Sequence, residues 1–379
     1  MKFIHLSDLH LGKKLHQVSL LEDQSYILEE ILRIVDQEKI DGVLLAGDIY
    51  DRIYPPAEAI SLFDSFLVRL VERKCLVFVI SGNHDSPERI AFLGRLTRKA
   101  GVYLSPVYDG RITGITLEDE YGALNVYLLP FIKPAHVRHF YPQEEIIDYS
   151  TALEVAIKQM EINKEERNIL VGHQFVTGAI RSDSEEISIG GLDNVAAEVF
   201  SAFDYVALGH LHRSQWVGRE AVRYCGSPLT YSFSESEDSK SVTILEVREK
   251  GNLFTRQVPL TPLRRTICLR GRFTELLEKR QEEKINEEDF VRITLLDEED
   301  IPDAFHRLAL IYPGLLQLEY DNTRTRKKQE LQLVQTYKEL SPIELLAGFY
   351  EKMNNQPLNE RQTAYLEEKL EKIWEGGEK

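Results

Sequence analysis

The chain opens with MKFIHLSDLHLG at residues 1–12, and a second apolar run, VLLAGDIYD, occupies residues 43–51. In both stretches a few bulky apolar residues pass directly into polar ones: Asp8 and His10 in the first, Asp48 and Asp51 in the second. A nearly continuous apolar run of this length is typical of a strand that is covered on both faces. Each stretch therefore predicts a buried strand that ends in a polar turn.

The same pattern occurs three more times along the chain. Apolar runs at 76–80, 169–171 and 206–208 lead into Gly82-Asn83-His84-Asp85, Gly172-His173 and Gly209-His210-Leu211-His212. Helical periodicity separates the runs, at 19–38, 57–73, 87–100 and 149–163. This alternation predicts a layered α/β core. Further β-type segments at 126–130, 222–225, 242–247 and 254–258 predict a second sheet in the same domain.

The pattern of predicted strands and helices changes after Pro262. Three short strands (266–270, 290–295, 315–319) with two helices between them (275–283, 302–311) predict a small βαβαβ module. A charged linker follows at 323–340, and two amphipathic helices are predicted at 343–353 and 359–374. We therefore expect a domain at 1–262, a small α/β domain at 263–322, the linker, and terminal helices within 341–379.

Composition narrows the possible functions. The 379 residues include 62 acidic and 46 basic ones, for a net charge of −16. Such a chain is not a simple cationic DNA-coating protein, although an enzyme that supplies positive charge through bound metal remains open. The three cysteines are far apart and predict reduced thiols. No apolar run reaches the roughly 18 residues that span a bilayer, and no signal peptide precedes the first strand, so we expect a cytosolic protein.

The polar clusters at the strand ends carry the chemistry. In open α/β sheets ligands bind beyond the carboxyl ends of the strands, so five such clusters are expected to converge. Asp, Asn and His without cysteine suit Mn²⁺, Fe²⁺ or Zn²⁺, and their number suffices for two ions. Two ions about 3.5–4 Å apart can activate a water for attack on phosphorus. Each motif alone could be a chance match or a structural histidine; five at strand ends favour a two-metal site.

Taken together, the motifs resemble the calcineurin-like metallophosphoesterase signature, complete and in order. More narrowly, the chain resembles the family of D subunits of bacterial SbcCD nucleases. That closer resemblance rests on HLSDLHLG, GDIYDRIYPP, SEEISIGGLDNV, FDYVALGHLH and YCGSPLTYSFSE. It implies a layered β-sandwich core flanked by helices, a small α/β capping domain, and C-terminal helices that bind a partner.

The resemblance also implies roles for individual residues. One metal, expected to be Mn²⁺ like its neighbour, would be held by Asp8, His10 and His212. The other would be held by Asn83, His173 and His210, with Asp48 bridging the two ions. His84 would not be a ligand; it would stabilise charge on the scissile phosphate or protonate the leaving alkoxide. Asp85 would either orient His84 or serve the turn structurally. Asp51 stands where archaeal relatives have a second histidine, so the resemblance does not carry a proton-shuttle or DNA-contacting role over to Asp51, and its role stays open.

The function that the resemblance implies is a Mn²⁺-dependent DNA nuclease within an ATP-regulated complex. Its activities would be 3′–5′ exonuclease on double strands and endonuclease on single strands and hairpins, in DNA repair, recombination and replication. The terminal helices would bind a coiled-coil ATPase in a cytoplasmic, nucleoid-associated complex; they could also fold back on the chain itself. Apolar residues in 57–73 and 87–100 would form a homodimer, although a core-facing stripe also explains much of that pattern.

The sequence also contains residues that could contact DNA. Lys13, Lys14 and His16 follow the first ligand turn and could contact phosphates or form a solvated loop. Ser227 and Tyr231 could line a DNA groove or lie in the core.

The first rival function is that of a phosphodiesterase or phosphatase acting on small substrates, which would not need the 120 or so residues after Pro262. The second is a catalytically silent scaffold, which the intact set of ligands disfavours.

Overall fold

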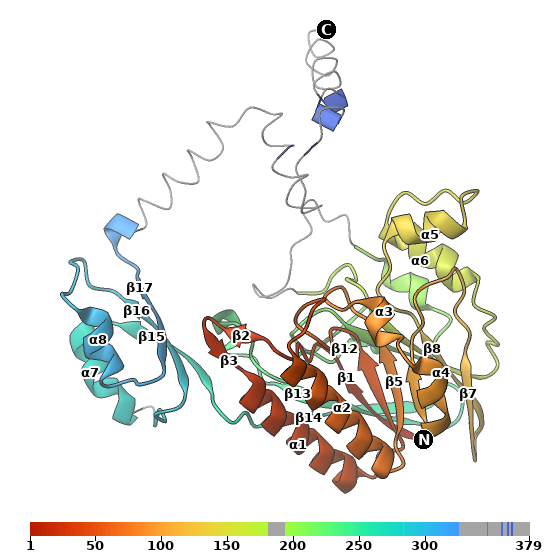
Figure 1. Cartoon of the computed structure of the whole chain (residues 1–379), viewed down its shortest axis with the longest axis horizontal. Coiled ribbons are helices and arrows are strands. Elements are labelled where there is room, and N and C mark those ends of the chain that lie inside the picture. Colours follow the sequence, from red (N-terminus) through yellow and green to blue (C-terminus); the bar gives the residue numbers. More distant parts are fainter. Residues whose placement is uncertain are drawn as a thin grey trace. The chain divides into compact units, whose positions relative to one another are not determined.

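The computed structural model describes residues 1–180, 194–282 and 284–325, together with a few single residues nearer the C-terminus. The chain divides into two compact units. The first is Met1–Ile267 with Glu288–Phe290, and the second is Cys268–Glu287 with Val291–Lys379. Figure 1 shows the elements of each unit, which are described separately below.

The first sheet of the larger unit contains the first three of the five apolar strands. Its order is β14-β13-β1-β4-β5-β6. Strand β1 pairs in parallel with β4 and antiparallel with β13, and β5 pairs in parallel with both β4 and β6. The strands are β1 (Lys2–Leu6), β4 (Gly42–Ala46), β5 (Leu76–Ile80), β6 (Val102–Leu104), β13 (Ser241–Val247) and β14 (Leu253–Pro259).

The second sheet contains the other two apolar strands and has the order β11-β12-β10-β9-β8-β7. Strands β8, β9, β10 and β12 run parallel, while β7 and β11 pair antiparallel at the two edges. The strands are β7 (Ile115–Asp119), β8 (Gly122–Leu128), β9 (Arg167–His173), β10 (Tyr205–Gly209), β11 (Gln215–Val217) and β12 (Arg219–Tyr224).

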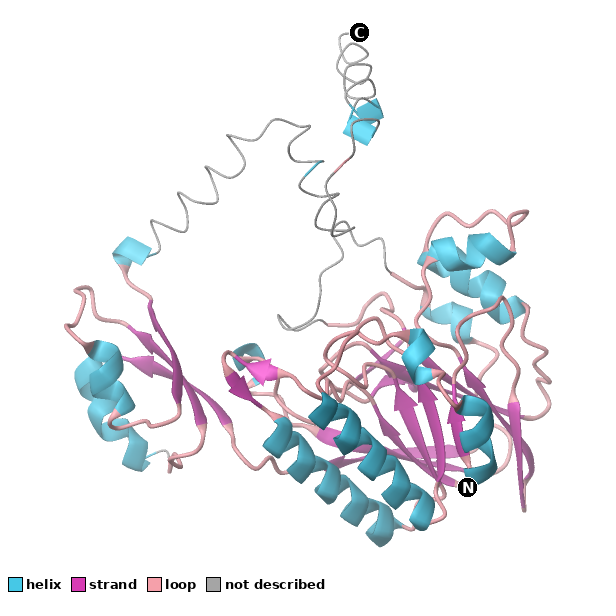
Figure 2. Cartoon of the chain, in the orientation of Figure 1, coloured by secondary structure: helices cyan, strands magenta, loops and turns pink. Residues whose placement is uncertain are grey.

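The two sheets form a sandwich because each has an apolar face to bury. Phe3 and Phe78 of the first sheet share one buried cluster with Ile169 and Tyr205 of the second. The opposite face of the second sheet packs against α6 (Tyr149–Lys158). Helices α1 (Leu21–Glu38) and α2 (Ala57–Glu72) flank the first sheet, as Figure 2 shows. The predicted layered β-sandwich with flanking helices is confirmed.

The predicted allocation of strands to the two sheets is wrong. The segments 242–247 and 254–258 form β13 and β14 of the first sheet, whereas 169–171 and 206–208 belong to the second. Local periodicity identifies a strand but not its partner, so this allocation could not be read from the pattern.

The predicted helix 87–100 is also interrupted. It forms α3 (Pro87–Ile90), α4 (Gly94–Thr97) and a 3-10 turn, η1 (Arg98–Ala100). The break falls at Leu93, whose φ of 60° is left-handed. Helix α6 likewise ends at Lys158, earlier than predicted.

Short elements complete the larger unit. Strands β2 (Lys14–Leu15) and β3 (Val18–Ser19) form a small hairpin directly after the first polar turn. The remaining pieces are α5 (Pro134–Phe140) and two 3-10 turns, η2 (Ala197–Phe200) and η3 (Phe233–Glu235).

The smaller unit is the predicted βαβαβ module. Its three-stranded sheet has the order β15-β16-β17 and buries Leu276, Ile293 and Leu308. The elements are β15 (Thr266–Gly271), α7 (Phe273–Glu282), β16 (Phe290–Leu295), α8 (Ala304–Ala309) and β17 (Leu315–Tyr320).

Some expectations fall on residues that the structure does not describe. Most of the linker 323–340, nearly all of the helices 343–353 and 359–374, and the SEEISIGGLD stretch lie outside the described residues. Among the helices that are described, none is both long and apolar enough to cross a membrane.

Candidate metal centre

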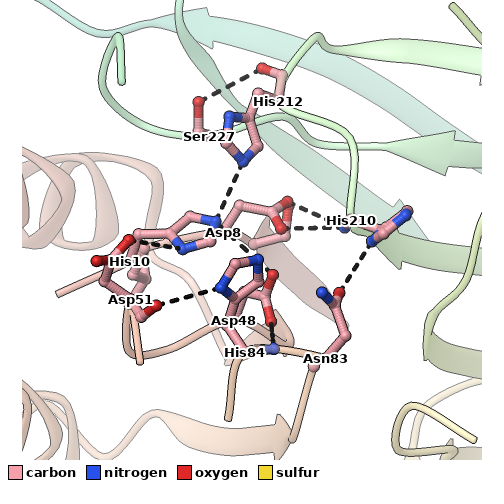
Figure 3. A network of polar contacts seen from close by, with 12 residues as sticks. Asp8, His10, Asp48, Asp51, Asn83, His84, His210, His212 and Ser227 are labelled. Carbon is pink, nitrogen blue, oxygen red and sulfur yellow. Dashed lines mark hydrogen bonds and ion pairs between the residues drawn. The ribbon is translucent and has the colours of Figure 1, made fainter. Parts of the chain in front are cut away.

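The polar strand ends of both sheets meet at one site, which Figure 3 shows at close range. The first sheet supplies Asp8 and His10 after β1, Asp48 after β4, and Asn83 and His84 after β5. The second sheet supplies His173 as the last residue of β9, and His210 and His212 after β10. The convergence predicted from strand-end placement is therefore present in the structure.

Unusual backbone angles aim several of these side chains into the site. Asp8, His10, Asp48 and His210 have φ values of 54°, 43°, 51° and 101°. Positive φ is costly for residues other than glycine and persists only where the surroundings enforce it. Backbone bonds provide that enforcement: Asp8 N donates to Gly47 O at 3.1 Å, and His10 N donates to Asp48 O at 3.0 Å.

Two glycines allow the two sheets to approach closely at the site. Gly47 has a φ of +84°, and a Cβ at this position would lie 2.5 Å from His173 Nδ1. A Cβ on Gly209 would overlap the carbonyl oxygen of Ala46. The glycine before Asp48 and the one before His210 are thus required by packing against the opposite sheet.

One group of donors consists of Asp8, His10 and His212. Their nearest ligand atoms all lie within 4.8 Å of one another. His10 Nε2 is 3.1 Å from His212 Nε2, so at most one of these nitrogens can carry a proton at that contact. The Asp8 carboxylate is fixed by the backbone N–H of His210, which lies 3.0 and 3.2 Å from its two oxygens.

A second group of donors consists of Asn83, His173 and His210. Asn83 Oδ1 lies 3.0 Å from both His173 Nε2 and His210 Nδ1. Between the two groups is Asp48, whose Oδ2 is 3.3 Å from His173 Nε2 and 3.7 Å from His10 Nε2. Asp48 is therefore placed to contact ions bound by either group.

Burial is the main influence on the pKa values of this cluster. It raises the pKa of Asp8 and lowers that of His10 well below its usual value. Burial would also lower the pKa of His173, but the Asp48 carboxylate outweighs it and raises that pKa to about 9. Buried carboxylates that lie beside imidazoles suit a cation, and the oxygen and nitrogen donors fit divalent metal ions.

His84 occupies the more open side of the site. It is half-buried, whereas His10 and Asp48 are buried. Its backbone N–H donates to Asp48 Oδ1 at 2.9 Å, and its Nδ1 lies 3.2 Å from the Asp51 carbonyl oxygen. If Nδ1 donates to that carbonyl, Nε2 remains available to a substrate.

The prediction that Asp85 orients His84 is wrong. The alternative prediction, a structural role in the turn, fits the structure. Both of its oxygens accept backbone N–H groups: Gly82 and Tyr50 at 2.9 Å, and Ile49 at 3.1 Å. The ring contact of His84 is made with the Asp51 carbonyl oxygen. Asp85 therefore ties the loop after β5 to the loop after β4.

Two residues predicted as possible DNA contacts are buried. Ser227 Oγ donates to Leu229 O at 2.8 Å, and the Tyr231 hydroxyl donates to Leu9 O. Burial raises the pKa of Tyr231. Both residues therefore belong to the core beneath the site, because neither side chain is accessible to a nucleic-acid backbone.

The basic segment after the first turn is mixed in character. Lys13 Nζ is 2.7 Å from Asp51 Oδ1, so part of its charge is already compensated beside the site. Lys14 and His16 are exposed in the β2–β3 hairpin. DNA contact by these three residues stays a prediction.

The sequence analysis missed three supporting residues. Gln24 of α1 donates to His10 O at 2.7 Å and accepts from Gly12 N at 2.9 Å. Glu235 lies 3.2 Å from His212 Nδ1, and Lys240 contacts Glu235 at 2.6 Å. Gln24 could have been suspected from the sequence, because it is a polar residue on the buried face of a helix. Glu235 and Lys240 could not, because they come from an ordinary polar loop.

The chain's own residues provide the frame for phosphoester hydrolysis. When bound, two divalent ions would activate a water and offset charge on a phosphate. Asp8, His10 and His212 would hold one of them, and Asn83, His173 and His210 the other. His84, on the open side and hydrogen-bonded at Nδ1, is placed to give a proton from Nε2 to a departing oxygen.

Comparison with known proteins agrees with this description. Residues 1–214 match the family model of the calcineurin-like phosphoesterases. Residues 259–354 match the model described as the type 5 capsule protein repressor C-terminal domain. Fold and site thus define a metal-dependent phosphoesterase of the calcineurin-like class.

Two curated relatives narrow the class to one family. The D subunit of the SbcCD nuclease from Staphylococcus epidermidis is 32% identical over 370 residues, which is 96% of each chain. The protein of the same name from Staphylococcus saprophyticus is 30% identical over the whole of both chains. The chain belongs to the family of SbcCD nuclease D subunits.

Among solved structures, a dimetal phosphatase from Danio rerio aligns with 69% of this chain and 98% of its own. Its TM-score is 0.41 and its sequence identity is 12%, so it carries no argument about function.

Proposed function

We propose that this protein is the nuclease component of an SbcCD-type complex and hydrolyses DNA phosphodiester bonds with two Mn²⁺ ions. The observation that carries the proposal is the convergence of Asp8, Asp48, Asn83 and the histidines from both sheets in one cluster, most of it buried. The family relatives carry the word nuclease in their names, which supports DNA as the substrate.

The proposed roles follow the geometry. Asp8, His10 and His212 hold one ion, Asn83, His173 and His210 hold the other, and Asp48 bridges them. His84 protonates the leaving oxygen. The activities we propose are 3′–5′ exonuclease on double strands and endonuclease on single strands and hairpins, in repair, recombination and replication. Lys13, Lys14 and His16 are proposed to contact the DNA backbone.

We propose a coiled-coil ATPase as the partner that controls access to the site. The net charge of −16 leaves little general affinity for DNA, so a partner that binds DNA would complement this chain. The predicted terminal helices 343–353 and 359–374 are the proposed docking segment. The complex is proposed to act in the cytoplasm at the nucleoid.

Cleavage assays test the substrate class directly. With Mn²⁺, the full chain is expected to cut end-labelled single-stranded and hairpin DNA, and chelator is expected to abolish cutting. The control substrate is bis-nitrophenyl phosphate, a small diester that needs the metal site but no DNA surface. Hydrolysis of the small diester without any cutting of DNA, even with the ATPase present, would favour the small-substrate rival.

We also propose a homodimer formed through residues 57–73 and 87–100. The apolar residues of α2 are only partly available, since Phe63, Phe66 and Leu70 face the core. The exposed ones are Ile60 and Val68 on α2, and Phe92, Leu93 and Leu96 in the second segment. Helix α2 packs on β5 and α4 on the neighbouring β6, so both helices lie near the β6 edge of the first sheet. Exposed apolar groups of this kind favour a protein interface.

Charged substitutions test the dimer. The double variant Phe92→Asp/Leu96→Asp is expected to change a dimeric chain to a monomer in sedimentation velocity, because desolvating two carboxylates in an apolar contact is unfavourable. The matched control is Leu310→Asp, which alters another exposed leucine, 84% accessible, in the smaller unit. A double variant that sediments as the native dimer would show that this surface is not the interface.

A further inference from the structure

The imidazole of His212 contacts a buried ion pair that is formed by Glu235 and Lys240. The Glu235 side chain is fully buried at the end of η3, and its Oε1 lies 3.2 Å from His212 Nδ1. This contact is on the ring edge opposite Nε2, the nitrogen that lies 3.1 Å from His10 Nε2. The carboxylate therefore contacts His212 on the side remote from the donor cluster.

Lys240 completes the pair and also holds the backbone of His212. Its Nζ donates to Glu235 Oε2 at 2.6 Å, to Ser227 Oγ at 2.9 Å and to the His212 carbonyl oxygen at 3.1 Å. The backbone N–H of Ser227 donates to the same carbonyl at 3.1 Å. His212 is consequently fixed at both its imidazole and its peptide group, and Figure 3 shows Ser227 beside it.

The acceptor chemistry determines which ring nitrogen of His212 carries the proton. A carboxylate can only accept, so the contact requires a proton on Nδ1, and in the neutral ring the lone pair then lies on Nε2. His173 has a comparable arrangement, with Nδ1 2.7 Å from the Ala46 carbonyl oxygen. A carboxylate polarises the imidazole more strongly than a neutral carbonyl and makes the unprotonated nitrogen a better metal donor.

We propose that Glu235 is a positioning residue that sets the tautomer and donor strength of His212 for one of the two metal ions. Lys240 keeps the Glu235 carboxylate charged in the interior and fixes the His212 peptide. The inference rests on the proposed function only in taking His212 as a ligand. Its alternative is a purely structural pair that ties the loop 225–240 to the end of β10.

Two double variants separate these roles without changing the net charge. Glu235→Leu/Lys240→Met replaces the pair with apolar side chains of similar size, a change that buried ion pairs often tolerate. Glu235→Gln/Lys240→Met also removes both charges but keeps an amide oxygen that can accept from His212 Nδ1. The control is Glu237→Leu, which removes an exposed acidic side chain from the same loop.

Calorimetric titration of the full chain with Mn²⁺ provides the main readout. The Leu/Met variant is expected to bind one of two ions roughly 10- to 100-fold more weakly, as loss of such supporting contacts does elsewhere. The Gln/Met variant is expected to recover most of that affinity, and Glu237→Leu to match the native chain. Equal native-like affinity in both double variants, or an equal loss in both, would overturn the inference.

A measurement on the native chain covers the case in which a variant does not fold. Long-range ¹H–¹⁵N spectra of the metal-free protein report which ring nitrogen of each histidine is protonated. We expect neutral His212 to carry its proton on Nδ1, and a neutral ring with the proton on Nε2 would contradict the inference. The same titration distinguishes failure of this inference from failure of the proposed function. A native chain that binds no Mn²⁺ would contradict the proposed function and this inference together.

Discussion

Replacing His84 with glutamine is expected to reduce DNA cleavage roughly 10²- to 10⁴-fold while two metal ions remain bound. A loss of that size corresponds to about 3–5 kcal/mol of transition-state stabilisation. The reason is position: His84 is a half-buried imidazole on the open side of the cluster, with Nδ1 3.2 Å from the Asp51 carbonyl oxygen. Glutamine can still form hydrogen bonds but cannot deliver a proton.

The leaving group makes this experiment specific for proton transfer. A sugar alkoxide is a poor leaving group and needs a proton, whereas nitrophenolate leaves without one. His84→Gln should therefore impair single-turnover cleavage of DNA far more than hydrolysis of bis-nitrophenyl phosphate. The control is His306→Gln, which changes an exposed histidine of the smaller unit. If His84→Gln instead loses a metal ion in a Mn²⁺ titration, His84 is a ligand and its assignment as proton donor is wrong.

Replacing Asp48 with asparagine is expected to abolish tight binding of at least one ion and to lower cleavage by roughly 10³-fold or more, since bound metal contributes several kcal/mol. Asp48 Oδ2 lies 3.3 Å from His173 Nε2 and 3.7 Å from His10 Nε2, so its charge faces both donor groups. Asparagine keeps the shape of the side chain and its hydrogen bond with His84 N but not the charge.

Thermal unfolding with and without Mn²⁺ measures the effect of Asp48→Asn independently of cleavage. Ions that bind the folded chain alone raise its melting temperature, so the native protein should be stabilised by added Mn²⁺. Most of that shift should be absent from the variant. Asp300→Asn, which changes an exposed carboxylate paired with Arg324, should retain it. Two ions bound by Asp48→Asn with native affinity would show that Asp48 does not bridge them.

The sequence predicted the strands well because each is a short, nearly pure apolar run. The runs at 43–46 and 76–80 become β4 and β5 almost residue for residue. It also predicted that their polar ends would meet, because parallel strands bring their carboxyl ends to one edge. Which sheet each strand joins was not predictable, since the pairing of β13 with β1 joins residues more than 230 positions apart.

The parts of the site that sequence reasoning missed depend on contacts made by the folded chain. Tyr231 follows a glycine-containing turn and could have faced solvent, yet its hydroxyl donates to Leu9 O beneath the first ligand turn. Glu235 occurs in a serine-rich acidic loop, where a carboxylate is normally solvated. Only the fold places Lys240 and His212 around it. The orientation of Asp85 was similarly decided by three backbone N–H groups from two different loops.

The spread of the donors along the chain has a consequence for biosynthesis. The first of them is residue 8 and the last is residue 212, and the supporting Lys240 is made later still. A ribosome that has released only the first sheet's ligands has produced half a site, with no imidazole from β9 or β10. An incomplete chain of that kind lacks His173, His210 and His212 and so cannot assemble either donor group in full. Nuclease competence therefore arises late in translation, when most of the larger unit already exists.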